Sequence, residues 1–394
     1  MALKFHVCIQ SSITWLLLFA VSSGVSSFVL TAGTLQPRQS IPALRAVFDS
    51  THGREEGDVV SDKGLDHDYV LHTAPSEAIS SGTAEIQEAY RRCDETGEPV
   101  GEKVMIKFSE NTKMMQREVE NTEDISDASN EDFIINVLDH NIPHSSTNEK
   151  MRGDTALIVM EKGSEDLLSY INNNDDLQHG DKLRQTMYSL VKSIASIHAK
   201  GLVWSDVKLS NFIVQDEAKT VKAIDLESCA PVGSYNPPKF TPSTCPPEFA
   251  WVIQRCLDGQ VDDVDHQVDY SFDIWSLGVI LWSVVTGTSF HRENMDIEAI
   301  TATLATIDQH SIDNDERLYY DTVDRLARDF ILKCLRVDPL ERATIEDLQW
   351  HPLLVGSTSA TGSTFTSKEP GSTYEQNHIS AYEEQLQQYY NQNY

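Results

Sequence analysis

Basic residues are scarce in this 394-residue sequence, which carries 31 Lys and Arg against 61 Asp and Glu and so has a formal net charge of -30. Nucleic-acid binding depends largely on cations that neutralise phosphates, so the charge balance argues against a nucleic acid partner. An anionic membrane surface would repel the chain for the same reason. Apolar residues make up 40% of the sequence, which is enough for a sizeable core. We therefore expect a folded, acidic protein that binds neither nucleic acid nor a bare membrane surface.

Cysteines at metal-binding spacing are missing. The sequence has six cysteines, none in a Cys-x-x-Cys pair and none accompanied by a cluster of histidines. Zinc sites depend on such groups, and disulfide frameworks are typical of short, cysteine-rich chains. We therefore expect neither a zinc site nor a disulfide framework, and we predict free, buried thiols. The six are Cys8, Cys93, Cys229, Cys245, Cys256 and Cys334.

The first 48 residues contain no Asp or Glu, which sets them apart from the rest of the chain. Lys4, the almost wholly apolar run Ile13–Val21 and the small residues up to Ser27 are together typical of a cleaved secretory signal peptide. The alternative is a membrane anchor, but nine residues fall well short of the roughly 20 that span a bilayer. We therefore predict a signal peptide over residues 1–27 and no stable membrane span in the mature chain.

Residues 28–66 are predicted to form a transit-like segment followed by a linker. Phe28 would be the first residue after cleavage, and the stretch to Phe48 is free of acids and contains Ser, Thr and two Arg, a transit-like composition. A signal peptide followed by Phe and a basic segment resembles the bipartite leader of algae with secondary plastids. The resemblance implies delivery to the plastid, with plain secretion or an endomembrane lumen as the alternative. Residues 49–66 are polar, acidic and glycine-containing, which is typical of a linker.

Apolar periodicity marks residues 67–354 as the folded domain. Val104–Phe108 and Ala156–Glu161 have the composition of strands, whereas residues 181–200 repeat apolar side chains at helical spacing. Strands come first and helices dominate later, which predicts an α+β domain with a small mixed lobe and a larger helical one. Residues 355–394 are rich in Gly, Ser, Thr, Gln and Asn, and we expect a disordered polar tail there.

Asp206, Lys208 and Asn211 stand in the order Asp-x-Lys-x-x-Asn between a predicted helix and a predicted strand. Transfer of a γ-phosphoryl group needs a carboxylate to accept the hydroxyl proton, a cation near the moving charge and an oxygen ligand for magnesium. These three residue types supply those functions. Asp225 follows a second predicted strand, where a further magnesium ligand would stand.

Further motifs follow in a fixed order, and with them the chain resembles a eukaryotic protein kinase over about 285 residues. They are Thr241-Pro242 up to Glu248, Asp273 at the start of an apolar helix, and Asp338-Pro-Leu-Glu-Arg342. The resemblance implies a bilobal kinase fold that uses ATP and Mg²⁺ and phosphorylates a protein substrate. It does not specify an oligomeric state.

The resemblance also implies a role for each motif residue. Asp206 would be the catalytic base, Lys208 would contact the phosphoryl group, and Asn211 and Asp225 would hold magnesium. Lys208 together with Thr241-Pro242 is similar to the Ser/Thr class rather than the Tyr class. The structural residues implied by the family are an ion pair of Glu248 with Arg342, which anchors the activation segment, and Asp273, which braces the catalytic loop.

The N-terminal part matches the kinase pattern less closely. By the resemblance, Lys107 is the strand lysine that holds the α- and β-phosphates, and its helix partner is Glu118 or, because an acidic insertion blurs the helix, Glu120. The backbone after Met160, from Glu161 to Gly163, would bind adenine.

Three motifs depart from the family pattern. The phosphate-covering loop keeps a single glycine, Gly82, so the backbone approaches phosphates less freely and we expect lower ATP affinity. Ser205 replaces the Arg that, in the family, pairs with a phosphate on the activation segment. Phosphorylation of that segment should therefore not switch activity on. Glu227 replaces a glycine hinge, so the segment should flip less readily. These departures leave a pseudokinase, acting as a binding scaffold, as the alternative function.

Overall fold

The computed structural model describes the middle of the chain and not its two ends. The described residues are 56–61, 64–72, 79–81, 84–128, 133–143, 155–174, 180–215, 220–261, 266–291 and 295–355. The predicted signal peptide, most of the predicted transit segment and the predicted tail lie outside these residues, as does Gly82.

The chain divides into two compact units. The N-terminal unit contains the chain up to Gly163 together with Asp225–Glu227 and Asp258–Val264, and the C-terminal unit contains the remainder. The N-terminal unit is built on an antiparallel sheet and the C-terminal unit is mostly helical, so the predicted α+β class is confirmed.

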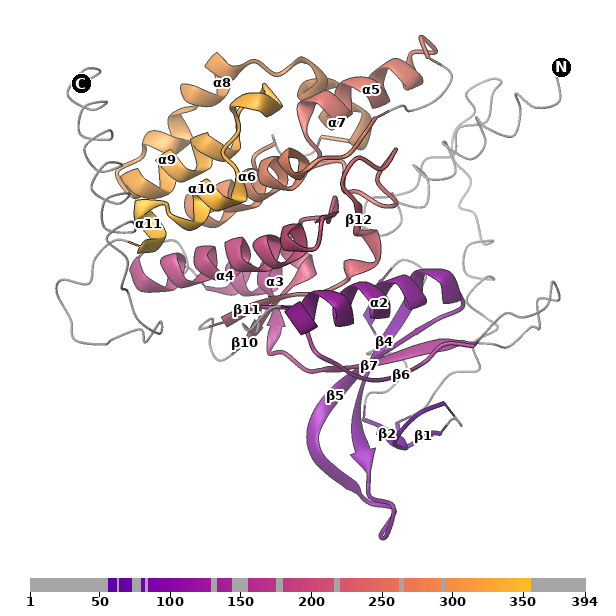
Figure 1. The fold of residues 1–394 in the computed structure, drawn as a ribbon. Helices are drawn as coiled ribbons and strands as arrows, with labels where there is room; N and C mark the ends of the chain where they lie inside the picture. Colours follow the sequence, from indigo (N-terminus) through magenta and orange to yellow (C-terminus); the bar gives the residue numbers. More distant parts are fainter. Residues whose placement is uncertain are drawn as a thin grey trace, which may run out of the picture. The chain divides into compact units, whose positions relative to one another are not determined.

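The sheet of the N-terminal unit has the strand order β1-β2-β4-β5-β7-β6, with β3 paired to β4, and all its pairs are antiparallel (Figure 1). The first strand lies within the stretch predicted as linker and pairs with the second. The strands are β1 (Val59–Val60), β2 (Tyr69–Leu71), β3 (Ile79–Ser81), β4 (Ala84–Arg92), β5 (Pro99–Ser109), β6 (Val137–Asn141) and β7 (Ala156–Glu161).

Alternation along β5 places the core of this unit and Lys107 on opposite faces of the sheet. Val104, Ile106 and Phe108 face one side of the sheet and join a buried apolar cluster with β2 and β7. Lys107 points to the opposite side, because successive side chains of a strand alternate. Helix α2 (Thr112–Ala128) packs on β6 and β7 and brings its side chains to Lys107.

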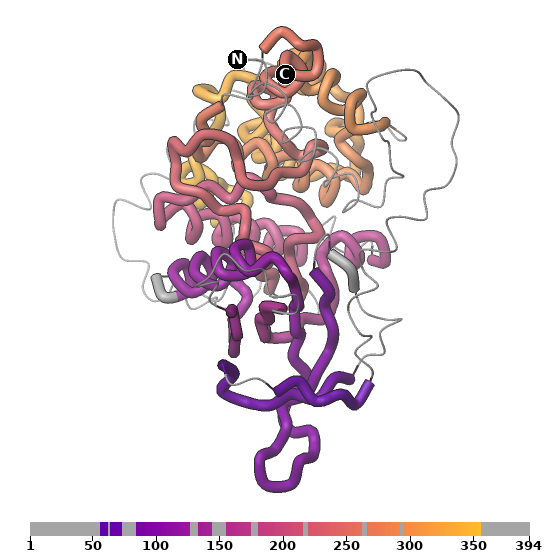
Figure 2. The backbone as a smooth tube through the Cα atoms, turned by 90° about the vertical axis from the view of Figure 1, so that its right-hand side faces the viewer, coloured from indigo at the N-terminus to yellow at the C-terminus, as the bar shows by residue number. Residues whose placement is uncertain are grey.

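Beyond the sheet, β4 and β5 continue as a hairpin. Their pairing runs from Ala84–Ser109 to Arg92–Pro99, with an irregularity between Tyr90 and Arg91. Figure 2 shows the turn of this hairpin projecting away from the rest of the sheet. The long pairing fixes the register of β5 and therefore the side on which Lys107 emerges.

The C-terminal unit is built from helices around α6, with short strands at one end. Its helices are α3 (Leu167–Asn173), α4 (Gly180–Ala199), α5 (Pro247–Leu257), α6 (Tyr270–Thr286), α7 (Ile297–Thr306), α8 (Gln309–Asp313), α9 (Arg325–Cys334), α10 (Ile345–Gln349) and α11 (Pro352–Val355). Strand β10 (Phe212–Gln215) pairs with β8 (Glu165–Asp166) and β11 (Thr220–Ala223), and β9 (Leu202–Val203) pairs with β12 (Ala230–Pro231).

Helix α6 is buried along most of its length, which its sequence explains. Asp269 caps its N-terminus by accepting a hydrogen bond from the Ser271 amide, and Gly287 ends it in the left-handed region at φ 66°. Gly278 lets α9 approach closely, because a Cβ at this position would lie 2.7 Å from Cβ of Cys334. A larger residue there would force the two helices apart.

Five cysteines fall within the described residues, and none of the five forms a disulfide bond there. Cys229, Cys245 and Cys334 are buried, as predicted, whereas Cys93 and Cys256 are half-buried. Burial raises the pKa of the Cys245 thiol, so this thiol stays protonated and unreactive. A search of the described helices finds none with the length and apolar character needed to cross a membrane.

Candidate active site

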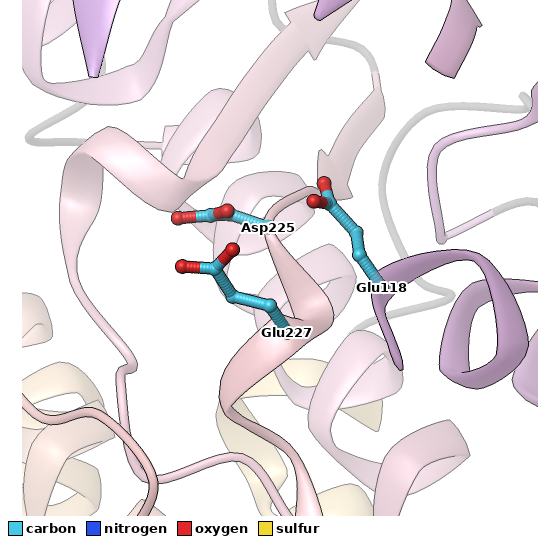
Figure 3. Close-up of side chains that lie close together, drawn as sticks. All are labelled: Glu118, Asp225 and Glu227. Atoms are coloured by element: carbon cyan, nitrogen blue, oxygen red, sulfur yellow. The ribbon is translucent and has the colours of Figure 1, made fainter. Parts of the chain in front are cut away.

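Lys107 is the centre of a buried charge cluster in the N-terminal unit. Its Nζ donates hydrogen bonds of 2.7 Å to Oε2 of Glu118 and 2.7 Å to Oδ1 of Asp225. A third carboxylate, Glu227, has Oε2 at 3.8 Å from the same nitrogen. Figure 3 shows the three carboxylates gathered together, one from α2 and two from the segment after β11. One ammonium therefore faces three carboxylates.

The surplus of negative charge has a clear effect on proton affinity. Burial alone would lower the pKa of Lys107, but Asp225, Glu118 and Glu227 together raise it well above its usual 10.5. Burial raises the pKa of Glu118 to about 7, and the Asp225 and Glu227 carboxylates add to this shift while Lys107 opposes it. The lysine is thus firmly charged, and Glu118 holds its proton more tightly than an exposed glutamate does.

The same carboxylates fit a metal ion by their chemistry. Oxygen atoms of Glu118, Asp225 and Glu227 all lie within 4.8 Å of one another. Carboxylate oxygens are the ligands that Mg²⁺ prefers. Lys107 already supplies one positive charge to the group, so a cation there would share the carboxylates with the lysine.

The helix partner of Lys107 is Glu118, which is buried. The rival, Glu120, is exposed and accepts a hydrogen bond from Gln116 on its own helix. Helix α2 continues through the acidic stretch as far as Ala128. It also holds the segment that carries two of the carboxylates, because Asn121 Nδ2 donates to the Leu226 carbonyl at 2.8 Å.

The residues predicted to bind adenine lie at the end of β7. Met160 and Glu161 are the last two residues of this strand, and Gly163 is the last residue of the N-terminal unit before the chain enters the other unit. Oε1 of Glu161 accepts hydrogen bonds from Asn136, at 2.9 Å from its amide and 3.1 Å from its side chain. This contact ties the end of β7 to the chain entering β6.

Asp206 is the centre of the second cluster, in the C-terminal unit, and is completely buried. Its Oδ1 accepts a 2.6 Å hydrogen bond from Oγ1 of Thr241. Its Oδ2 accepts from Nζ of Lys208 at 3.1 Å and from Nδ2 of Asn211 at 3.2 Å. A second ammonium, Lys239 Nζ, lies 3.7 Å from Oδ2. The sequence-predicted residues 206, 208, 211 and 241 are therefore brought together around one carboxylate.

Asp273 holds the loop that carries Asp206. Its carboxylate, fully buried in α6, accepts hydrogen bonds of 2.7 Å from the amides of Trp204 and Ser205, and His198 Nε2 lies 2.9 Å from it. Ser205 has φ 62°, a left-handed conformation that is costly for a residue with a Cβ. The two hydrogen bonds from these amides to Asp273 offset this cost. They also fix the direction in which Asp206 leaves the loop.

The ion pair predicted for the segment before α5 is present. Arg342 donates to both oxygens of Glu248, at 2.7 Å and 2.6 Å, and its Nε donates to the Arg336 carbonyl at 2.7 Å. The guanidinium is buried, and two parallel bonds to one carboxylate are the strongest arrangement such a pair adopts. The start of α5 is therefore tied to the end of the helical unit.

Sequence reasoning missed Lys239 and Asn121. A lysine two residues before Thr241 in an acidic chain was a weak signal for a second cation at Asp206. Asn121 lay in the acidic stretch that obscured the end of α2, and nothing in its residue type pointed to the Leu226 carbonyl. Glu227 was noticed as a replacement for glycine, but its approach to Lys107 was not foreseen.

Comparison with known sequences decides the family. The protein kinase domain family matches residues 82–354, which is more than half of the chain. The chain belongs to the protein kinase family. The match begins at the predicted phosphate-covering loop and ends within α11, so it includes both charge clusters.

Curated relatives of this kinase domain are similar at low identity. The SNF-related serine/threonine-protein kinase of Homo sapiens is 26% identical over 50% of this chain and 24% of its own length. Tribbles homolog 2 of Mus musculus is 28% identical over 57% of this chain and 62% of its own. Ribosomal protein S6 kinase alpha-3 of Mus musculus is 29% identical over 43% of this chain and 22% of its own length. The matched region thus spans less than two thirds of each of these relatives.

Proposed function

We propose that the chain is an active protein kinase that transfers the γ-phosphate of ATP to Ser or Thr hydroxyls of a protein. The observation that carries the proposal is the environment of Asp206, a buried carboxylate that contacts Thr241, Lys208 and Asn211. Relatives named as serine/threonine-protein kinases support the same class.

In this proposal, the C-terminal unit handles the substrate hydroxyl. Asp206 accepts the proton of the hydroxyl as it attacks, because a carboxylate held by fixed donors is well placed to act as a base. Lys208 places a positive charge beside the transferred group. Asn211 provides an amide oxygen for a magnesium ion while its Nδ2 holds the Asp206 carbonyl at 2.9 Å.

The N-terminal unit would hold the nucleotide. Mg-ATP, when bound, would supply the phosphoryl group, and its magnesium ion would supply positive charge. Lys107 binds the α- and β-phosphates, Asp225 is a magnesium ligand, and the backbone from Met160 to Gly163 binds adenine. Glu118 keeps Lys107 extended towards its ligands through their 2.7 Å contact.

The second candidate is a scaffold that binds a nucleotide or a protein without catalysis. The observation that favours it is the crowding of Lys107 by three carboxylates, since Glu227 adds a charge that repels phosphates. The single glycine of the phosphate-covering loop points the same way.

Transfer of radiolabelled phosphate from Mg-ATP to a mixed protein substrate separates the two functions. The kinase proposal expects labelled protein from the wild type and at least roughly a hundredfold less from Asp206→Asn. A thermal shift with Mg-ATP provides a second arm, because nucleotide binding stabilises the folded state by mass action. A Mg-ATP shift without any labelled protein would reject the kinase and support the scaffold.

We also propose that residues 1–48 deliver the protein to a plastid through the secretory pathway. The support is the acid-free composition and the position of Phe28 after the predicted signal peptide. A fluorescent fusion of residues 1–50, expressed in an alga with secondary plastids, should reach the plastid. Phe28→Ala should hold the fusion in the endomembrane system; equal distributions would overturn the role given to Phe28.

A further inference from the structure

Lys239 contacts the catalytic loop through both its backbone and its side chain. Its carbonyl accepts a hydrogen bond of 3.0 Å from Oγ of Ser205, and its Nζ lies 3.7 Å from Oδ2 of Asp206. The side chain is only 15% exposed. Lys239 comes from the segment between β12 and α5, whereas Ser205 and Asp206 belong to the loop after β9. These two parts of the C-terminal unit, which are far apart in sequence, therefore meet at Lys239 as well as at Thr241.

Ser205 provides the other half of this contact. Its hydroxyl is within hydrogen-bond distance of three carbonyls, those of Trp204 at 2.7 Å, Lys239 at 3.0 Å and Ser228 at 3.3 Å. The backbone amide of Ser205 donates a hydrogen bond to the buried carboxylate of Asp273, so the position of the Ser205 hydroxyl is fixed. A hydroxyl carries one proton, so it donates to one of these carbonyls at a time, and two of the three belong to the segment. Ser205 can therefore bond the segment at residue 228 or at residue 239.

The charge at Asp206 makes the lysine more than a structural contact. Asp206 is fully buried, and an ionised carboxylate in such a place needs cations and donors around it. Lys208 belongs to the same loop as Asp206, so the distance between these two residues does not depend on the position of the segment. Lys239 belongs to the segment, so its charge reaches Asp206 only while the segment is in place.

We propose that Ser205 and Lys239 form an internal clasp that holds residues 228–244 against the catalytic loop and positions Asp206 without a phosphate. Lys239 is a positioning residue, because it acts through Asp206. The effect on turnover rests on the proposed kinase function, whereas the clasp itself is a property of the fold.

Hydrogen–deuterium exchange of the phosphate-free full chain tests the clasp directly. Ser205→Ala removes the hydroxyl and Lys239→Met removes the charge while keeping the aliphatic stem. Each should raise amide exchange in peptides covering residues 228–244 at least fivefold, and Lys239→Arg should keep the wild-type rate. Matched controls are Ser193→Ala, which removes a buried hydroxyl bonded within α4, and Arg325→Met, which removes an exposed cation of the same unit. Both controls should leave the segment unchanged.

Steady-state kinetics distinguish a positioning role of Lys239 from a general contribution to the stability of the fold. Lys239→Met should lower kcat roughly tenfold and leave the KM for ATP within twofold, and Lys239→Arg should recover most of kcat. A merely structural role would change both constants and the thermal midpoint together, which would overturn the positioning role. A wild type without any phosphotransfer would reject the kinase proposal, while the exchange experiment would still judge the clasp.

The clasp is overturned by two results. One is a segment that exchanges at the wild-type rate in both Ser205→Ala and Lys239→Met. The other is a wild-type segment that exchanges as fast as the variants until a residue in it is phosphorylated. If Ser205→Ala does not fold, Lys239→Met alone decides, because its partly exposed side chain can be replaced without opening the core.

Discussion

Lys107 and Asp206 lie in different units and are surrounded by opposite charges. Lys107 is one cation among three carboxylates, whereas Asp206 is one carboxylate with two ammonium groups and a hydroxyl near it. The cluster around Lys107 therefore has more carboxylates than cations, whereas both oxygens of Asp206 face cations or hydrogen-bond donors. The residues that differ from the family pattern explain much of this contrast, because Glu227 adds a charge to the first cluster and Ser205 fixes the segment that brings Lys239 to the second.

The largest expected effect comes from the carboxylate at the centre of the second cluster. Asp206→Asn removes the proton acceptor but keeps the shape and the hydrogen-bond reach of the side chain. Turnover of phosphate transfer should fall by roughly 10²–10⁴, the usual contribution of a general base. The variant should keep the fold, and steady-state assays at saturating Mg-ATP measure the loss. Wild-type turnover in this variant would show that Asp206 is not the base.

The first cluster should make stability depend on pH with a defined sign. The folded-state pKa of Glu118 is raised to about 7, so the folded protein binds this proton more tightly than the unfolded chain does. The bound proton therefore adds to the free energy of unfolding at low pH, and this contribution is lost as pH rises from about 4.5 to about 7. The loss is on the order of 3 kcal/mol in the free energy of unfolding. Urea denaturation at pH 5 to 8 measures it.

Glu118→Gln is the variant that isolates this effect, because its amide cannot titrate. The unfolding free energy of wild type minus that of Glu118→Gln should fall as pH rises through the same range. Glu120→Gln is the matched control, since Glu120 is on the same helix but exposed, and its difference from wild type should stay flat. Parallel curves for wild type and Glu118→Gln would mean that the carboxylate does not hold its proton in the fold.

Glu227 tests whether the crowding of Lys107 weakens nucleotide binding. Glu227→Gln removes one negative charge near Lys107 and keeps the side-chain volume. We expect the KM for ATP to fall roughly fivefold, about 1 kcal/mol, with kcat within twofold. Glu227→Asp, which keeps the charge, should resemble the wild type. A KM that rises in Glu227→Gln would instead make Glu227 a favourable part of the nucleotide site.

The contrast between the clusters also shows how far sequence reasoning extends. The apolar composition of Val104–Phe108 and Ala156–Glu161 predicted these two strands, and apolar residues at helical spacing over residues 181–200 predicted α4, because burial leaves such patterns in the sequence. Glu118 and Glu120 could not be separated by sequence, since both are acidic residues on one helix, although they point about 160° apart around its axis. Only the packing of α2 on the sheet decides which one reaches Lys107.

The contacts of Ser205 are of a kind that no sequence pattern reveals. Its hydroxyl meets backbone carbonyls, and every residue has a carbonyl, so the residue types at 228 and 239 carry no signal for it. The Arg–carboxylate pair of Arg342 and Glu248 was predictable for the opposite reason. It joins two side chains that stand in recognisable motifs.

The smallest expected effect concerns phosphorylation of the segment that Ser205 fastens. The hydroxyl-bearing residues from Asp225 to Glu248 are Ser228, Ser234, Tyr235, Thr241, Ser243 and Thr244. Ser228 and Thr244 are buried, and Thr241 already donates its hydroxyl to Asp206. An added phosphate would find Ser205 uncharged and the chain strongly negative, so it would gain no ion pair there. Phosphatase treatment of protein made in a eukaryotic host should change turnover by less than about threefold, under ~0.7 kcal/mol in the barrier. A tenfold loss that rephosphorylation of one of these residues restores would show that the segment is ordered by phosphate and not by the contacts of Ser205.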